Sequence, residues 1–224
     1  MKFWLFMLIF PVMLIMPAFS QEIITAERYL EMVSERYGSV RDYEAHIVIT
    51  SGSNEMPGNL SYLSPSFLRI DFTRPMNQVI VFNGELLTVY LPEYRAVLNQ
   101  NITQSRRPGA SMANAQGLSL LRRNYVSSFV TGPEPVPLDG TRETVVQLRL
   151  VRRTVSEGFR EIILSVDPGT RLIRRIEGRT IADGLVRFDF TNIRTNLGIP
   201  ELRFVYDAPA SAYVYNNFLF RDTD

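Results

Sequence analysis

The sequence of 224 residues contains no cysteine. A disulfide framework is therefore excluded, and so is every metal or catalytic site that depends on a thiolate. A lipoprotein signal is excluded as well, because lipid attachment requires a cysteine directly after the cleavage point. The protein must be stabilised by an ordinary apolar core, which a chain of about 200 residues can build as one domain.

Histidine is almost as scarce, since His46 is the only one. Ser-His-Asp and Cys-His sites need a histidine base, and most zinc sites need several His or Cys ligands. The motifs G-x-S-x-G, G-x-G-x-x-G and G-K-[ST] are absent too. The sequence therefore predicts a protein that is not an enzyme and that has no catalytic residues, no metal ion and no cofactor. Two carboxylates that are distant in the sequence can still meet in the folded protein and act as an acid and a base. An envelope hydrolase with such a pair is therefore the alternative.

Lysine occurs once, as Lys2. Of the 24 basic residues, the other 23 are arginines, and their number equals that of the 23 acidic residues. Once Lys2 is removed with the first residues, the formal charges therefore balance. Proteins that bind nucleic acid usually carry a basic excess. The balance of charge therefore predicts that nucleic acid is not a partner.

The first 20 residues have the pattern of a secretory signal peptide. Lys2 supplies one positive charge, Phe3 to Met16 is apolar apart from Pro11, and Pro17 to Ser20 ends in small residues that suit cleavage before Gln21. An uncleaved membrane anchor is the alternative, but the apolar run would reach only ~21 Å as a helix, against a hydrocarbon core of ~30 Å. We therefore expect export, removal of residues 1–20, and one domain over residues 21–224.

One helix is expected at the start of the exported chain, where Thr25 can cap the first turn and Gly38 can end the last. After it, short runs of apolar residues are separated by turn residues, of which Asn83-Gly84 is the strongest hairpin signal. We expect about eleven or twelve strands, the last two over Leu202 to Tyr206 and Tyr213 to Phe220. This spacing predicts a mainly β protein with one antiparallel sheet, rolled or sandwiched.

A second helix is predicted from Gly117 to Val130, with Arg122 and Arg123 pointing away from its apolar stripe. The stripe comprises Leu118, Leu121, Tyr125 and Phe129. A polar segment from Asn101 to Gln116 precedes this helix and a proline-rich segment follows it. We therefore expect a helix that covers part of the sheet, packs only partly and can move, that is, a lid.

The strands on either side of Asn83-Gly84 carry the apolar face that this lid is expected to cover. The residues assigned to it are Leu68, Ile70, Phe72, Val79, Val81, Leu87 and Val89. Leu68, Ile70 and Phe72 alternate along one strand and therefore share a face, and we expect the other four to continue it. A closed core that binds nothing is the alternative left open by the periodicity. Under a movable cover, the same face would form a cavity that binds lipid.

Several short runs together form a recognisable pattern. Tyr62 to Pro75 reads YLSPSFLRIDFTRP, and it is followed by VIVFNG at residues 79–84 and LTVYLP at residues 87–92. The opening helix with Tyr43 to Thr50, and the late residues Ile199-Pro200, Phe204 and Pro209, add further parts of the pattern. Over most of the exported chain, this pattern resembles that of the periplasmic lipoprotein carrier (LolA-like) family.

The resemblance implies a half-open antiparallel β-barrel of about eleven strands, with an N-terminal helix and a lid helix. It also implies a soluble periplasmic carrier, expected as a monomer, that shelters the acyl chains of lipoprotein or lipid cargo. Such a carrier receives cargo from a releasing complex of the inner membrane and delivers it to an acceptor of the outer membrane.

Two residues depart from the family pattern. Ser64 stands where many carriers have an arginine before the proline, and Thr88 stands where they have a tryptophan. The departures leave the cargo and the docking partners open. The same fold also serves sensors, so a sensor of lipid or envelope stress that regulates a membrane partner is the alternative function.

Overall fold

The structure, a computed structural model, describes residues 24–102 and 113–219. The predicted signal peptide lies outside these residues, as does most of the polar segment predicted between Asn101 and Gln116. In the described part of the chain, no helix is long and apolar enough to cross a membrane. The elements are α1 (Ala26–Gly38), β1 (Asp42–Ser51), β2 (Asn54–Leu63), β3 (Phe67–Phe72), β4 (Val79–Phe82), β5 (Leu86–Leu91), η1 (Pro92–Tyr94), β6 (Ala96–Asn101), α2 (Ala115–Asn124), β7 (Tyr125–Phe129), β8 (Val136–Pro137), β9 (Thr144–Arg152), β10 (Phe159–Val166), β11 (Ile173–Thr180), β12 (Leu185–Thr195), η3 (Glu201–Phe204) and β13 (Tyr213–Asn216).

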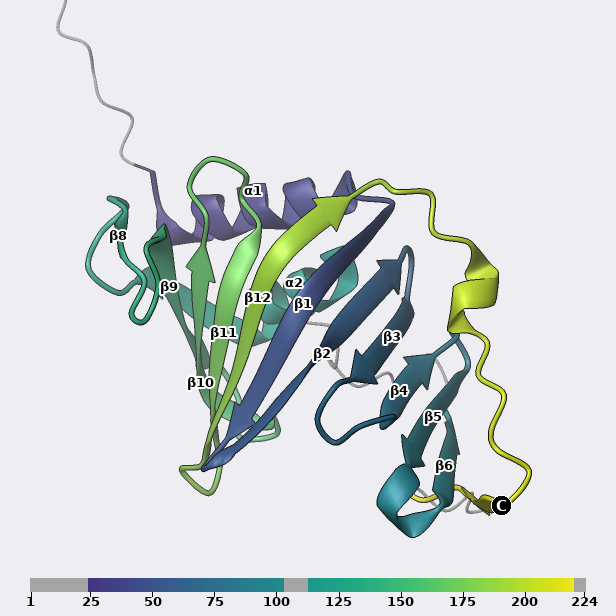
Figure 1. The fold of residues 1–224 in the computed structure, drawn as a ribbon. Helices are drawn as coiled ribbons and strands as arrows, with labels where there is room; N and C mark the ends of the chain where they lie inside the picture. The colour runs from purple at the N-terminus through teal and green to yellow at the C-terminus, as the bar shows by residue number, and fades with distance from the viewer. Residues whose placement is uncertain (1–23, 103–112, 220–224) are drawn as a thin grey trace, which may run out of the picture.

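The strands form one open, curved sheet (Figure 1). Their order is β13-β6-β5-β4-β3-β2-β1-β12-β11-β10-β9-β7, and β8 pairs with β9 beside this order. Neighbouring strands are antiparallel, except that β13 runs parallel to β6. The pairing of β1 with β12, in which Ile47 lies opposite Phe190, joins the first half of the chain to the second. The predicted fold class, a mainly β protein with two helices and a half-open antiparallel β-barrel, is confirmed, and the barrel takes the form of this open, curved sheet.

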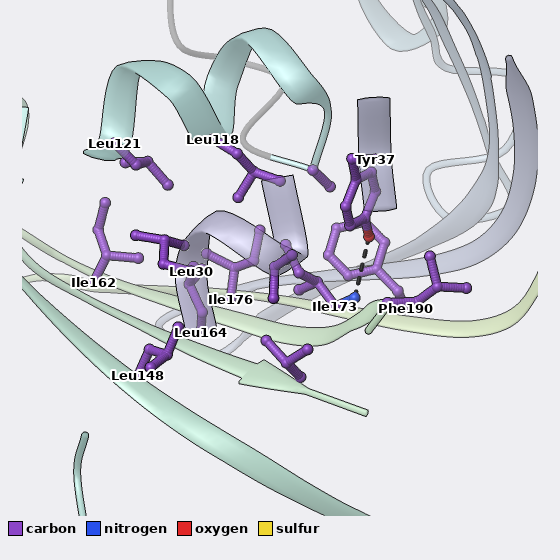
Figure 2. Close-up of a cluster of buried hydrophobic side chains, with 14 of the residues drawn as sticks. Leu30, Tyr37, Leu118, Leu121, Leu148, Ile162, Leu164, Ile173, Ile176 and Phe190 are labelled. Atoms are coloured by element: carbon purple, nitrogen blue, oxygen red, sulfur yellow. Dashed lines mark hydrogen bonds between the residues drawn. The ribbon is translucent and has the colours of Figure 1, made fainter. Parts of the chain in front are cut away.

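Both helices lie on one side of the sheet, behind the half that β9 to β12 and β1 form (Figure 1). We call this side the inner face and the other side the outer face. Helix α1 begins as predicted, because the hydroxyl of Thr25 accepts a hydrogen bond from the backbone N–H of Arg28 at 3.2 Å. Leu30 of α1 points toward Leu164 of β10, and Leu118 of α2 lies on the other side of α1 (Figure 2). All three side chains are buried, so this half of the inner face is a filled core.

The C-terminal segment, residues 196–219, follows the other half of the molecule (Figure 1). The buried carboxylate of Asp42 accepts hydrogen bonds from the backbone N–H groups of Leu197 at 2.6 Å and Gly198 at 3.1 Å. Phe204 of η3 then packs on the outer face of β3 and β4, in a cluster with Leu63, Val79 and Val81. The segment ends with β13, which extends the sheet beyond β6.

The second helix is shorter than predicted. It ends at Asn124, and Tyr125–Phe129 form β7, which pairs with β9. The backbone of Tyr125 is already extended, with φ −124° and ψ 154°. The run Tyr-Val-Ser-Ser-Phe favours a strand, since aromatic and β-branched side chains lose rotamer freedom in a helix. The predicted helix to Val130 is therefore wrong over its second half.

The count and the end of the strands also differ from the prediction. Within residues 24–102 and 113–219, the sheet has 13 strands rather than eleven or twelve. Residues 202–206, predicted as a strand, instead contain most of the 3₁₀ turn η3, in which the N–H of Arg203 donates to the carbonyl of Pro200 at 3.0 Å. This turn places the apolar side chain of Phe204 against the sheet, and that burial outweighs the extended preference of the run.

Candidate functional site

The inner face continues beyond the two helices, over β3 to β6. In one row of paired residues Leu68 lies beside Phe82, and Phe82 lies beside Leu87. In the next row Ile80 lies beside Val89, and Val89 lies beside Leu98. We call these six residues the open apolar face: Leu68, Ile80, Phe82, Leu87, Val89 and Leu98. All six are only half-buried, in contrast to the filled core under the helices.

The faces of Val79 and Val81 were predicted wrongly. In the pairing of β3 with β4, Val81 lies opposite Arg69 and Val79 opposite Asp71, so both valines point to the outer face. A shift of one residue in the register moves every side chain of a strand to the other face. Ile80 and Phe82, which were not among the predicted residues, therefore take their place on the inner face.

The other predicted residues share one face, as expected. Leu68, Leu87 and Val89 belong to the open apolar face. Ile70 and Phe72 lie on the same side of β3 but are buried, with 6% and 4% of their surfaces exposed, and they belong to the main core. The binding of lipid by these residues stays a prediction.

The predicted lid residues meet in the core although they come from two elements. Leu118 and Leu121 of α2 are 0% and 5% exposed. The expectation that this helix is only partly packed against the sheet is therefore wrong. Tyr125 and Phe129 of β7 also point inward, since positions four residues apart share a face both in a helix and in a strand. The ring of Phe129 lies 6.0 Å from that of Tyr29 in α1. Movement of α2 stays a prediction.

The polar contacts around α2 differ from the expectation as well. Arg122 was predicted to point away, but its Nη2 atom donates to Oε1 of Glu31 in α1 at 2.8 Å. Both side chains are about one-third exposed, and an ion pair at this exposure contributes about 1 kcal/mol or less. The burial of the two leucines, rather than this ion pair, therefore holds α2 on α1.

Two buried tyrosines, Tyr37 and Tyr43, bring hydroxyl groups into the core. The hydroxyl of Tyr37 accepts a hydrogen bond from the N–H of Ile173 at 3.1 Å (Figure 2), and burial raises the pKa of Tyr37 to about 12. Burial raises the pKa of Tyr43 well above its usual value too, and its hydroxyl donates to the carbonyl of Ala113 at 2.9 Å. Both groups are therefore uncharged at neutral pH.

The single histidine and the two residues that depart from the family pattern lie on the outer face or in a turn. His46 lies on the outer face beside Thr191. Thr88, at the position where carriers have a tryptophan, points outward beside Val81 and donates to Oδ1 of Asn99 at 3.0 Å. Ser64 is exposed in the turn between β2 and β3. In the described residues, no group of three or more His, Asp or Glu side chains is placed to hold a metal ion.

Comparison with known proteins identifies related folds. The model of the family described as "Outer membrane lipoprotein carrier protein LolA" matches residues 49–207. An uncharacterized conserved protein from Thermus thermophilus has 12% identity and a TM-score of 0.55, over 85% of this chain and 98% of that chain. The lipoprotein LppX of Mycobacterium tuberculosis has 8% identity and a TM-score of 0.52, over 78% and 97% of the two chains.

A third similar structure is the MucA/MucB complex of Pseudomonas aeruginosa. It has 16% identity and a TM-score of 0.51, over 82% of this chain and 61% of that chain. At such identities these similarities concern the fold alone. A search of curated protein sequences finds no match.

Proposed function

The chain belongs to the outer membrane lipoprotein carrier (LolA) family, and on that premise we propose that it shelters the acyl chains of lipoproteins or lipids and delivers them toward the outer membrane. The observation that carries this proposal is the open apolar face. A row of aliphatic and aromatic side chains on the inner side of a sheet is normally buried under a second layer. Here Phe82, Leu87, Val89 and their neighbours are only half-buried.

The burial of an acyl chain on the open apolar face supplies a large favourable free energy. Each methylene group removed from water contributes about 0.8 kcal/mol. An acyl chain that buries roughly ten methylene groups on this face would therefore gain about 8 kcal/mol, from which the entropic cost of association is subtracted. The filled half of the inner face offers no comparable gain, because Leu148, Leu164 and Ile176 are already buried there by the helices.

The remaining parts of the proposal follow from the family and the sequence. Residues 1–20 act as the signal peptide, and residues 21–224 work in the periplasm as one lipid-binding domain without catalytic activity. Acylated cargo comes from a releasing complex of the inner membrane and passes to an acceptor of the outer membrane. The protein acts as a monomer, since one sheet supplies the whole open apolar face.

The substitution Val89→Glu tests the proposal. Val89 is half-buried in the middle of the open apolar face, so a carboxylate there can remain hydrated while it repels an acyl chain. We expect binding of a fluorescent long-chain fatty acid to weaken about tenfold or more, with little change in the melting temperature. Val151→Glu is the matched control, because Val151 is 44% exposed on β9 and its paired neighbour Val126 is exposed as well.

Equal binding by the wild type and Val89→Glu would contradict the proposed surface. A transfer assay then separates the carrier from the sensor. A carrier loaded with acylated cargo should release it to an acceptor, whereas cargo that stays bound in the presence of every membrane fraction would favour the sensor.

A further inference from the structure

Two adjoining clefts lie on the outer face, on the side of the sheet away from the open apolar face. One has a volume of about 570 Å³ and lies between the C-terminal segment and strands β1, β3 and β12. The other, of about 540 Å³, lies along β1, β2 and β12. Both are lined by Glu44, Arg194 and Arg203. We call the two clefts together the outer trough, and both are open to solvent.

Three guanidinium groups line the trough, and two carboxylates accompany them. Arg194 donates through Nη2 to Glu44 at 2.8 Å. Arg203 donates through Nη2 to Asp71 at 2.5 Å, and Arg69 holds the same carboxylate at 2.9–3.0 Å. Two arginines therefore share one aspartate, and the side chains around the trough carry an excess of positive charge.

Arg194 and Arg203 each use one nitrogen in these contacts. Their Nε and Nη1 atoms donate to no other described residue, and their side chains are 68% and 37% exposed. A guanidinium group can hold a carboxylate through two parallel hydrogen bonds. Both arginines are thus able to take an additional anionic group from a ligand in the trough. The buried Asp42 does not compete, since its oxygens accept from backbone N–H groups of the C-terminal segment.

The walls of the trough add apolar and neutral polar contacts. Leu197 and Leu202 of the C-terminal segment line one end, and they are 46% and 77% exposed. Asn59, Ser61 and Asn192 line the other end. Basic groups at the centre, apolar side chains at one end and amide or hydroxyl groups at the other suit an extended peptide better than a single small anion.

We propose that the outer trough binds an acidic segment of a partner protein, with carboxylates on Arg194 and Arg203 and an apolar side chain against Leu197 and Leu202. The sheet separates this site from the open apolar face. A lipid whose acyl chains lie on the inner face therefore cannot fill the trough with its head group. A partner can dock at the trough while cargo is bound, and the site exists whether or not the inner face binds lipid.

The test uses a fluorescein-labelled hexapeptide of alternating leucine and glutamate, and a glutamine version of it as the uncharged probe. Fluorescence anisotropy should show binding of the acidic peptide that weakens with salt, because partly exposed charges are screened. Arg194→Gln should weaken this binding roughly fivefold or more. Arg149→Gln is the matched control, since Arg149 is 53% exposed on β9 and also pairs with one glutamate, Glu161. It should bind as the wild type does.

Circular dichroism of Arg194→Gln confirms that the fold is kept, and amide chemical shifts should change at residues 44–46, 59–61 and 192–203. Val89→Glu should bind the peptide normally, so that a failure of lipid binding and a failure of this proposal are told apart. Equal affinity for both peptides, or equal loss in the Arg194→Gln and Arg149→Gln variants, would overturn it. Binding of vesicles that contain phosphatidylglycerol through Arg194, without binding of the acidic peptide, would overturn it too and assign the trough to a membrane surface.

Discussion

Truncation of Leu118 to alanine measures how firmly α2 is held. The side chain is 0% exposed and lies between α2 and α1 (Figure 2). Removing a fully buried leucine costs about 2–5 kcal/mol, because apolar contacts are lost and a cavity is left. In a chain of this length, each kcal/mol lowers the melting temperature by about 2–4 °C. We therefore expect Leu118→Ala to lower the melting temperature by roughly 4–20 °C.

Calorimetry and urea denaturation of the exported protein provide the measurement, together with the rate at which a fluorescent fatty acid enters. If α2 is a fixed part of the core, the rate of entry should not change. Leu202→Ala is the control, since Leu202 is 77% exposed and should alter stability by no more than about 0.5 kcal/mol. A loss below about 1 kcal/mol in Leu118→Ala, combined with faster entry, would refute this reasoning and favour the movable lid that the sequence suggested.

Two further predictions concern pH and the C-terminal segment. Burial holds the pKa of Tyr37 at about 12, above the ordinary value of 10, so the folded state keeps this proton more tightly than the unfolded chain. The free energy of unfolding should therefore stay level below about pH 10 and fall as the pH rises toward 12, and melts of Tyr37→Phe should show a smaller fall. Asp42→Asn replaces a buried acceptor of two N–H groups, so it should cost roughly 1–3 kcal/mol and speed proteolysis of residues 196–219. The exposed Asp207→Asn is its control, and equal cleavage rates in the two variants would exclude an anchoring role for Asp42.

The exposed and buried sides of α2 show why its contacts were only partly predictable. The spacing of Leu118 and Leu121 predicts one apolar side, and the structure buries both residues. Arg122 follows the same helical rule and was expected to face solvent. Its partner, Glu31, lies 91 positions earlier in the chain, and no local pattern in the sequence indicates that α1 will lie beside it.

The sequence by itself determined the parts of this protein that depend on neighbouring residues. Thr25 caps α1, Asn83-Gly84 joins β4 to β5, and alternation places Leu68, Ile70 and Phe72 on one face. These features arise from hydrogen bonds and side-chain directions within a few residues, which the sequence contains.

Only the tertiary structure decided where the chain leaves apolar surface open. Val79, Ile80, Val81 and Phe82 are all apolar, so alternation could not show which two face inward, and the pairing of β4 with β3 settled it. The four-residue spacing of Tyr125 and Phe129 fits a helix and a strand equally, and the pairing of β7 with β9 settled that boundary. In both cases the decisive energy comes from strands distant in the sequence. The same long-range packing places the helices over one half of the sheet (Figure 1) and leaves the apolar side chains of the other half only half-buried.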